Sequence, residues 1–258
     1  MYRLAPNIEL LFTEAGPDHA DRVRAAAAAG FDAVEMWGTA SKDLPSIAGA
    51  LADTGVSMTS IVVEPRTDFA LPWETADAFS AGLDRAVEAA HLLGCPRVVT
   101  GSGVGYGGAT RTANHERLAG IFRRAVDRIE GSGVALLLEA VNTRVDHPGA
   151  LLDHTADAAD VVRRVGSDSF RLLYDLYHSV TQGEDPTVEL AAFADLVEYV
   201  QIADSAGRGE PGTGGIDWPA RLSDLRTAGY AGPIGLEYAP TTTTEASAEY
   251  IRRLARSA

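Results

Sequence analysis

Residues 136–144 read LLLEAVNTR, and the chain changes abruptly there from apolar to polar. Three leucines follow a glycine-rich turn at residues 131–133, and an apolar run this short predicts a buried parallel strand. Glu139 stands where this strand should end. A carboxylate at the end of a buried strand is unfavourable unless a cation, a hydrogen-bond network or chemistry compensates for its charge. The role of Glu139 then depends on whether other strands end in the same way.

The same alternation continues along the chain, where short apolar runs precede longer amphipathic segments in eight successive pairs. The predicted strands lie at about residues 5–12, 31–37, 56–63, 97–101, 136–144, 170–175, 196–203 and 234–238. The predicted helices lie at about residues 18–29, 44–54, 73–93, 113–130, 155–165, 187–193, 218–228 and 244–255. These units predict an α/β fold, a single (β/α)8 TIM barrel domain over residues 1–258. A doubly wound open sheet is the alternative, although it usually has fewer units.

Charge and composition exclude several classes of protein. The formal net charge of −14 argues against nucleic acid or an anionic membrane as the main partner. No stretch approaches the roughly 18 apolar residues of a membrane span. The N-terminus has no basic region followed by an apolar core, so a signal peptide is not expected. Cys95 is the only cysteine, so no internal disulfide can form. These features together predict a cytoplasmic protein.

Four successive predicted strands each end in a side chain with an oxygen donor. The residues are Glu139, Asp175, Gln201 and Glu237, separated by 36, 26 and 36 positions. The active site of a TIM barrel lies at the C-terminal ends of its strands, so these side chains should surround one mouth. Carboxylate and amide oxygens are hard ligands that suit Mg²⁺ or Mn²⁺. Each could instead be a separately satisfied polar residue, but their repetition on consecutive strands favours a divalent metal site.

Four segments carry a resemblance to a known family. They read LEAVNTR at 138–144, LLYDLYH at 172–178, GRGEPGTG at 207–214 and GLEY at 235–238. In this order they resemble the hydroxypyruvate isomerase family, which belongs to the xylose-isomerase-like TIM barrels. The resemblance is dense from about residue 130 to 240 and diffuse before it. It implies that Glu139 and Glu237 are the catalytic acid/base pair, and that the metal is bound by Glu139, Asp175, Gln201 and Glu237.

Two segments depart from the pattern of that family. Residues 98–103 read VVTGSG and lack the histidine that usually ends the fourth strand. Residues 64–69 read EPRTDF and lack the usual Gly-Asp-Trp and Gly-Glu-Arg-Gly elements. Both segments would shape the pocket around the far end of the substrate. The resemblance therefore predicts the class of reaction more closely than the substrate.

Five further residues are candidates for the substrate pocket or for support of the metal ligands. His178, Arg208 and Glu210 are expected to contact the substrate, with Arg208 binding a carboxylate or hydroxyl group and Glu210 orienting Arg208 or His178. Asn142 and Arg144 follow the first predicted ligand closely and are expected to support it. The alternatives are a surface histidine, an arginine–glutamate pair that holds the loop, and ordinary loop hydrogen bonds.

Three other features have a weaker claim to function. Glu35 and Glu64 end the second and third predicted strands, and either could face the pocket. Residues 103–108 match G-x-G-x-x-G, but the next strand ends 31 residues further on at Glu139. In a dinucleotide-binding motif the acidic residue follows after about 20 residues, so nucleotide binding is not expected. Cys95 precedes a proline and is expected to pack in the core.

The sequence and the resemblance together predict a divalent-metal-dependent, aldose–ketose type isomerase. Its substrate would be a small hydroxy-carbonyl compound, such as a keto acid or short sugar, which reacts through an enediolate with two glutamates as acid and base. A ketose 3-epimerase on the same site and a non-catalytic sugar-binding relative are the alternatives. Phosphodiester hydrolysis is less favoured. The endonucleases that share this barrel fold have a tri-zinc site rich in histidine, whereas His178 is the only histidine near a predicted strand end here. The expected partners are a small molecule and, for a homo-oligomer, further copies of the chain.

Overall fold

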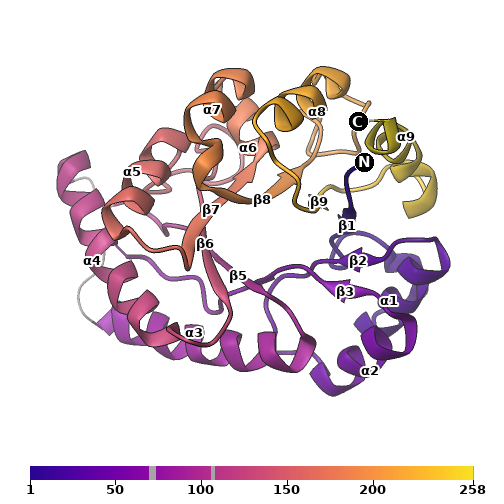
Figure 1. Ribbon diagram of the computed structural model, residues 1–258, viewed down its shortest axis with the longest axis horizontal. Coiled ribbons are helices and arrows are strands. Elements are labelled where there is room, and N and C mark those ends of the chain that lie inside the picture. Colours follow the sequence, from indigo (N-terminus) through magenta and orange to yellow (C-terminus); the bar gives the residue numbers. More distant parts are fainter. Residues whose placement is uncertain (70–73, 106–107, 258) are drawn as a thin grey trace.

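The computed structural model describes residues 1–69, 74–105 and 108–257, in which helices surround a curled parallel sheet (Figure 1). The strands are β1 (Leu4–Pro6), β2 (Ala33–Val34), β3 (Ser57–Met58), β4 (Ile61–Val62), β5 (Arg97–Thr100), β6 (Ala135–Glu139), β7 (Phe170–Asp175), β8 (Val197–Ile202) and β9 (Ile234–Leu236). The helices are α1 (His19–Ala28), α2 (Leu44–Thr54), α3 (Glu74–Leu93), α4 (Arg111–Ile129), α5 (Thr155–Val165), α6 (Leu176–Gln182), α7 (Pro186–Phe193), α8 (Trp218–Thr227) and α9 (Thr244–Ser257). Short 3-10 helices lie at Thr13–Ala15 and Ala194–Leu196.

The strands pair in parallel and close into a barrel. A seven-stranded sheet has the order β1-β9-β8-β7-β6-β5-β4, and β2 pairs with β3. A bridge between Asn7 and Glu35 joins β1 to β2. β3 and β4 are the two halves of the strand predicted at 56–63, which is interrupted at Thr59 and Ser60. This architecture confirms the predicted α/β TIM barrel.

The barrel interior contains a small apolar layer. It consists of Val99, Leu137, Leu173 and Tyr199, which pack against one another. Leu136 and Leu138 belong instead to the larger core between the sheet and the helices. Successive side chains of a strand point to opposite faces, so this division follows directly from the pleat. The three leucines of the opening stretch therefore serve both cores.

Most element boundaries agree with the sequence prediction. α2, α5 and β7 have the predicted bounds. The first predicted strand is too long, because the chain turns after Pro6, where the N–H groups of Leu10 and Leu11 donate to the carbonyl of Asn7. Trp73, the predicted start of the third helix, and part of the glycine-rich motif at 103–108 lie outside the described residues. Among the described helices, none is both long and apolar enough to cross a membrane.

The sequence does not predict α6, which begins directly after β7. Asp175 ends the strand and caps the helix, since its Oδ1 accepts from the N–H of Tyr177 at 2.8 Å and of His178 at 3.4 Å. No turn residues separate the two elements, so the sequence offers no loop signal between them. The abrupt change of direction places His178 in the first helical turn, beside the carboxylate of Asp175.

Candidate active site

The four predicted metal ligands each lie two residues beyond an inward-facing position. The preceding residues are Leu137, Leu173, Tyr199 and Gly235, in the order of the ligands Glu139, Asp175, Gln201 and Glu237. Asp175 pairs with Gln201 across β7 and β8, and Gln201 pairs with Gly235 across β8 and β9. The pleat therefore turns these side chains toward the barrel interior at the C-terminal ends of the strands.

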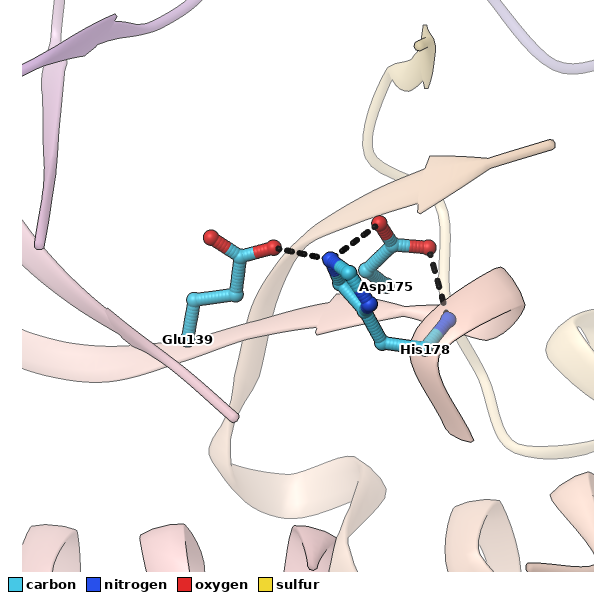
Figure 2. Close-up of side chains that lie close together, drawn as sticks. All are labelled: Glu139, Asp175 and His178. Carbon is cyan, nitrogen blue, oxygen red and sulfur yellow. Dashed lines mark hydrogen bonds and ion pairs between the residues drawn. The ribbon is translucent and has the colours of Figure 1, made fainter. Parts of the chain in front are cut away.

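Glu139, Asp175 and His178 form a close group at this mouth (Figure 2). One side-chain donor atom from each of the three residues lies within 4.8 Å of the others. Nε2 of His178 is 3.6 Å from Oε1 of Glu139 and 3.6 Å from Oδ2 of Asp175. The imidazole on α6 thus lies between a carboxylate from β6 and a carboxylate from β7.

Asn142 determines which nitrogen of His178 carries the proton. Nδ1 of His178 lies 3.3 Å from the backbone N–H and 2.6 Å from Nδ2 of Asn142, and both of these groups are donors. The side-chain oxygen Oδ1 of Asn142 accepts hydrogen bonds from the N–H groups of Val145 and Asp146, which fixes the orientation of the side-chain amide. Nδ1 is therefore an acceptor, and Nε2 carries the hydrogen. Burial lowers the pKa of His178 to about 4, so the ring is neutral at pH 7.

Arg208 joins two of the carboxylates. Its Nη2 lies 3.0 Å from Oδ2 of Asp175 and 2.9 Å from Oε2 of Glu237. The residue has a left-handed backbone with φ of 55°, and its guanidinium lies over the ring of Tyr177 at 5.1 Å. Its Nε is buried and has no hydrogen-bond partner among the described residues. Arg208 thus supplies one positive charge to the mouth and keeps one donor available.

The two glutamates have different surroundings. Glu237 accepts from Nε1 of Trp37 at 2.6 Å as well as from Arg208. Burial raises the pKa of Glu237, and Arg208 and Trp37 partly oppose that rise. The pKa of Glu139 is raised well above its ordinary value by burial and by the charges of Glu237 and Asp175. Both groups can therefore hold a proton closer to neutral pH than an ordinary carboxyl group.

Gln201 is oriented by Glu35, a completely buried residue at the end of β2. Nε2 of Gln201 donates to Oε1 of Glu35 at 2.8 Å, so the carbonyl end of the amide is directed away from Glu35. Glu35 also accepts from Tyr199 at 2.6 Å, from Asn7 at 3.1 Å and from Ser60 at 3.3 Å. Burial and the nearby Glu237 raise the pKa of Glu35 to about 8. The sequence marked Glu35 as the end of a strand but did not predict this network.

Glu210 and Arg144 lie in other surroundings. Glu210 accepts from the hydroxyl of Thr241 at 2.6 Å and from its N–H at 3.0 Å, which joins the loop after β8 to the loop after β9. Arg144 is exposed, and its guanidinium lies beside Gly183 at the end of α6. The structure therefore brings Asn142 into contact with His178, whereas the contacts of Glu210 and Arg144 are with other segments.

Three residues at the mouth were not among the sequence candidates. Trp37 donates to Glu237, as described above, and it closes the strand predicted at 31–37. Asp146 accepts from Nδ2 of Asn142 at 2.6 Å. Arg66 lies on the loop after β4, and its charge lowers the pKa of Glu139. Loop residues such as these have no periodic signal, so only the folded chain reveals them.

The donor set fits a divalent cation. Among the described residues, Arg208 is the one guanidinium paired with the interior carboxylates of Asp175 and Glu237, and Glu139 adds a third carboxylate, which leaves negative charge uncompensated. Gln201 directs a carbonyl oxygen away from Glu35, and amide and carboxylate oxygens are the ligands that hard cations prefer. His178 presents N–H at Nε2, which suits it for donating to an oxygen rather than for binding a metal.

Comparison with known proteins gives a consistent result. The family model for xylose isomerase-like TIM barrels matches residues 23–254. A Streptomyces coelicolor protein with a provisional assignment as a hydroxypyruvate isomerase is 36% identical, over 92% of this chain and 91% of its own. Hydroxypyruvate isomerase of Escherichia coli is 29% identical over 97% and 98% of the two chains. The 2-oxo-tetronate isomerase of Cupriavidus necator is 29% identical over 98% of each.

Solved structures agree on the fold. A Brucella melitensis protein with the name AP endonuclease, family 2, has a TM-score of 0.90 and 30% identity, over 98% of this chain and 99% of its own. The 3-keto-D-glucoside 4-epimerase YcjR of E. coli has a TM-score of 0.83 at 19% identity, over 98% and 99%. IolI, which was solved with a zinc atom, has a TM-score of 0.81 at 18% identity, over 98% and 96%.

Proposed function

Because the chain belongs to the hydroxypyruvate isomerase family of the xylose isomerase-like TIM barrels, we propose that it is a divalent-metal-dependent isomerase of the aldose–ketose type. Its substrate is a small hydroxy-carbonyl compound, such as a keto acid or a short sugar acid. The observation that carries the proposal is the presence of two buried glutamates at one mouth, Glu139 and Glu237, whose pKa values are both raised. A proton transfer between neighbouring carbons needs groups of this kind, because they can give up and take back a proton near neutral pH.

The two glutamates have complementary roles in this proposal. One of them removes the proton on the carbon next to the carbonyl group, which produces an enediolate. The same or the other glutamate returns a proton to the neighbouring carbon. Glu237 is held by Trp37 and Arg208, whereas the side chain of Glu139 has, among the described residues, only the 3.6 Å contact with His178. The less restrained Glu139 is therefore the better candidate for the residue that moves the proton.

The residues that would hold the cation are Glu139, Asp175, Gln201 and Glu237, and their oxygen donors suit Mg²⁺ or Mn²⁺. When bound, the cation would supply a Lewis acid for the carbonyl oxygen of the substrate. His178 would donate its Nε2–H to a substrate oxygen, and Arg208 would offer the unpaired Nε. A carboxylate-rich site of this kind supports isomerisation over phosphodiester hydrolysis.

Two variants test the catalytic roles. Glu139→Gln and Glu237→Gln should each reduce turnover of hydroxypyruvate by about 10²–10⁴-fold, as expected when a general acid or base is lost. Glu249→Gln, on the exposed face of α9, is the matched control and should retain wild-type turnover. A protein that only binds sugars would lose metal affinity in the first two variants, and wild type would show no turnover to lose.

The same reaction in heavy water separates isomerase from epimerase. Isomerisation places deuterium on the carbon that was the carbonyl, while epimerisation leaves it at the inverted centre. We expect the first pattern with hydroxypyruvate. If Mn²⁺-loaded protein catalyses no exchange with any short ketose or 2-keto acid, the proposed function is wrong.

A further inference from the structure

We propose that Arg66, on the loop after β4, binds a carboxylate of the substrate at the end away from the reacting carbons. Arg66 would then distinguish the carboxylate-bearing substrates of the proposed function from neutral sugars. This inference rests on the proposed function, and it concerns a segment in which the sequence departs from the family pattern.

The loop that carries Arg66 lies at the mouth and is held on both sides. The N–H of Val63 donates to the carbonyl of Val99 at 2.9 Å, so the loop starts where β4 leaves the barrel. On one side, Oε2 of Glu64 accepts from the N–H of Ala40 at 3.0 Å. On the other, Oδ1 of Asp68 accepts from the N–H of Val104 at 2.9 Å. The backbone around Arg66 is therefore anchored to the loops after β2 and β5.

The two acidic neighbours of Arg66 are both engaged elsewhere. Glu64 and Asp68 lie two positions before and after it, and each is directed at a backbone N–H of an adjacent loop. Between them, Thr67 is buried. Arg66 itself is exposed, and within the described residues it has neither a hydrogen bond nor an ion pair. An arginine held at the mouth without a protein partner can accept an anionic ligand.

Its charge reaches the candidate active site. Burial has the largest effect on the pKa values of Glu139, Glu237 and His147. Arg66 lowers all three pKa values, as the second-largest effect for His147 and as a smaller one for the two glutamates. These residues come from β6, from the end of β9 and from the loop after β6. These interactions agree with the position of the loop, which leaves β4 at the C-terminal end of the barrel and is anchored to the loops after β2 and β5.

Three other cationic side chains among the described residues already have carboxylate partners. Nζ of Lys42 lies 2.7 Å from Oε1 of Glu9, and Nε2 of His19 lies 3.0 Å from Oε2 of Glu9. Arg208 is shared between Asp175 and Glu237. A divalent cation together with Arg208 would balance the three interior carboxylates. The charge of Arg66 is then left to match one negative charge on the substrate.

The chemistry of a guanidinium suits this role. It can donate two parallel hydrogen bonds to a carboxylate, and its long side chain can follow a ligand into the mouth. A neutral ketose would offer only hydroxyl groups at the same position and would leave the charge of Arg66 uncompensated. The same residue therefore predicts discrimination between an acid and its neutral analogue.

A matched pair of compounds tests the proposal in the metal-loaded protein. Hydroxypyruvate and dihydroxyacetone share a three-carbon skeleton and differ in a carboxylate against a hydroxymethyl group. Arg66→Met should raise KM for hydroxypyruvate by about 10–100-fold, the loss expected for hydrogen bonds to a charged group, while kcat changes little. Arg66→Lys should recover part of the loss. Arg24→Met, which removes an exposed arginine from α1, should behave as wild type.

Binding of tartronate, a non-isomerising dicarboxylate, gives a readout that is independent of turnover. Titration calorimetry should show tartronate binding about 10–100-fold more weakly to Arg66→Met than to wild type, with an intermediate value for Arg66→Lys. Equal tartronate affinity in wild type and Arg66→Met overturns the proposal. An equal loss of kcat/KM for hydroxypyruvate and dihydroxyacetone also overturns it, because that pattern indicates a structural role. If wild type converts neither compound, the proposed function fails, and tartronate affinity still decides the role of Arg66.

Discussion

The side-chain amide nitrogen of Gln201 donates a hydrogen bond to Oε1 of Glu35 at 2.8 Å. Glu35 is completely buried, so a residue that never reaches the mouth determines how a residue at the mouth presents its oxygen. Loss of a partner that orients a metal ligand in this way typically lowers metal affinity by about 10–100-fold. The relationship therefore connects the interior of the barrel to the proposed metal site.

Removal of the Glu35 carboxylate should weaken the proposed metal site. We expect Glu35→Ala to lower the affinity for Mn²⁺ by about 10–100-fold, because the amide of Gln201 loses its partner. Glu35→Gln keeps an oxygen acceptor and should lose less. Titration calorimetry with Mn²⁺ measures both, and Ser60→Ala, which removes only the 3.3 Å contact, is the control. Wild-type affinity in Glu35→Ala would show that Gln201 does not depend on Glu35.

Glu35 should also make stability depend on pH in the metal-free protein. Its pKa is about 8 in the folded state against an ordinary value of 4.5, so between these values the folded state binds more protons than the unfolded state. The free energy of unfolding should therefore fall as pH rises from about 4.5 to about 8, and then level off. Urea denaturation at pH 5.5 and pH 8 measures the change.

Glu35→Gln separates this contribution from that of the other buried acids. Glu139 and Glu237 also have raised pKa values and act in the same direction, so part of the pH dependence should remain. The variant should lose the part that belongs to Glu35 and show a shallower decline than wild type. Identical pH dependence in the two proteins would mean that Glu35 does not change its charge over this range.

Asn142→Asp should exchange the protonated nitrogen of His178. A carboxylate at this position accepts a hydrogen from Nδ1, which leaves Nε2 without its proton and facing Glu139 and Asp175. We expect at least about a tenfold loss of kcat, since the ring can no longer donate to the substrate. Nitrogen-15 NMR of the histidines reports the protonated position directly, with His178→Asn to assign the signal. An unchanged Nε2–H signal would contradict the assignment of roles to the two nitrogens.

Cys95 should be unreactive in the folded protein. Burial raises the pKa of its thiol to about 12 from an ordinary value of 9.0, which lowers the thiolate fraction at pH 8 by about a thousandfold. Iodoacetamide at pH 8 should therefore modify the protein far more slowly in buffer than in urea, as followed by intact mass. Comparable rates in the two solvents would show that the site opens readily.

Much of the fold could be predicted because it depends on local periodicity. The eight-fold alternation of apolar runs and amphipathic segments is enough to predict a barrel, and the capped helices α2 and α5 appear at their predicted bounds. The ends of the strands were less predictable. The first strand ends early because the chain turns at Asn7, and the strand predicted at 56–63 is divided into β3 and β4. Hydrogen bonds with neighbouring strands decide where each strand ends. The residue pattern within a strand does not show which neighbouring residues it will bond to, so its end cannot be predicted from that pattern.

For the candidate site, the residue pattern alone identifies the oxygen-donor side chains that end four consecutive strands. Glu139, Asp175 and Glu237 each lie two positions past an inward-facing residue, and the period of two is a property of the chain alone. Contacts between segments that are distant in the sequence exist only in the tertiary structure. The folded chain places Glu35 beside Gln201, and it leaves Arg66 without a partner among the described residues although acidic residues flank it. Burial and the nearness of other charges set the pKa of each carboxylate, and both quantities exist only in the folded chain.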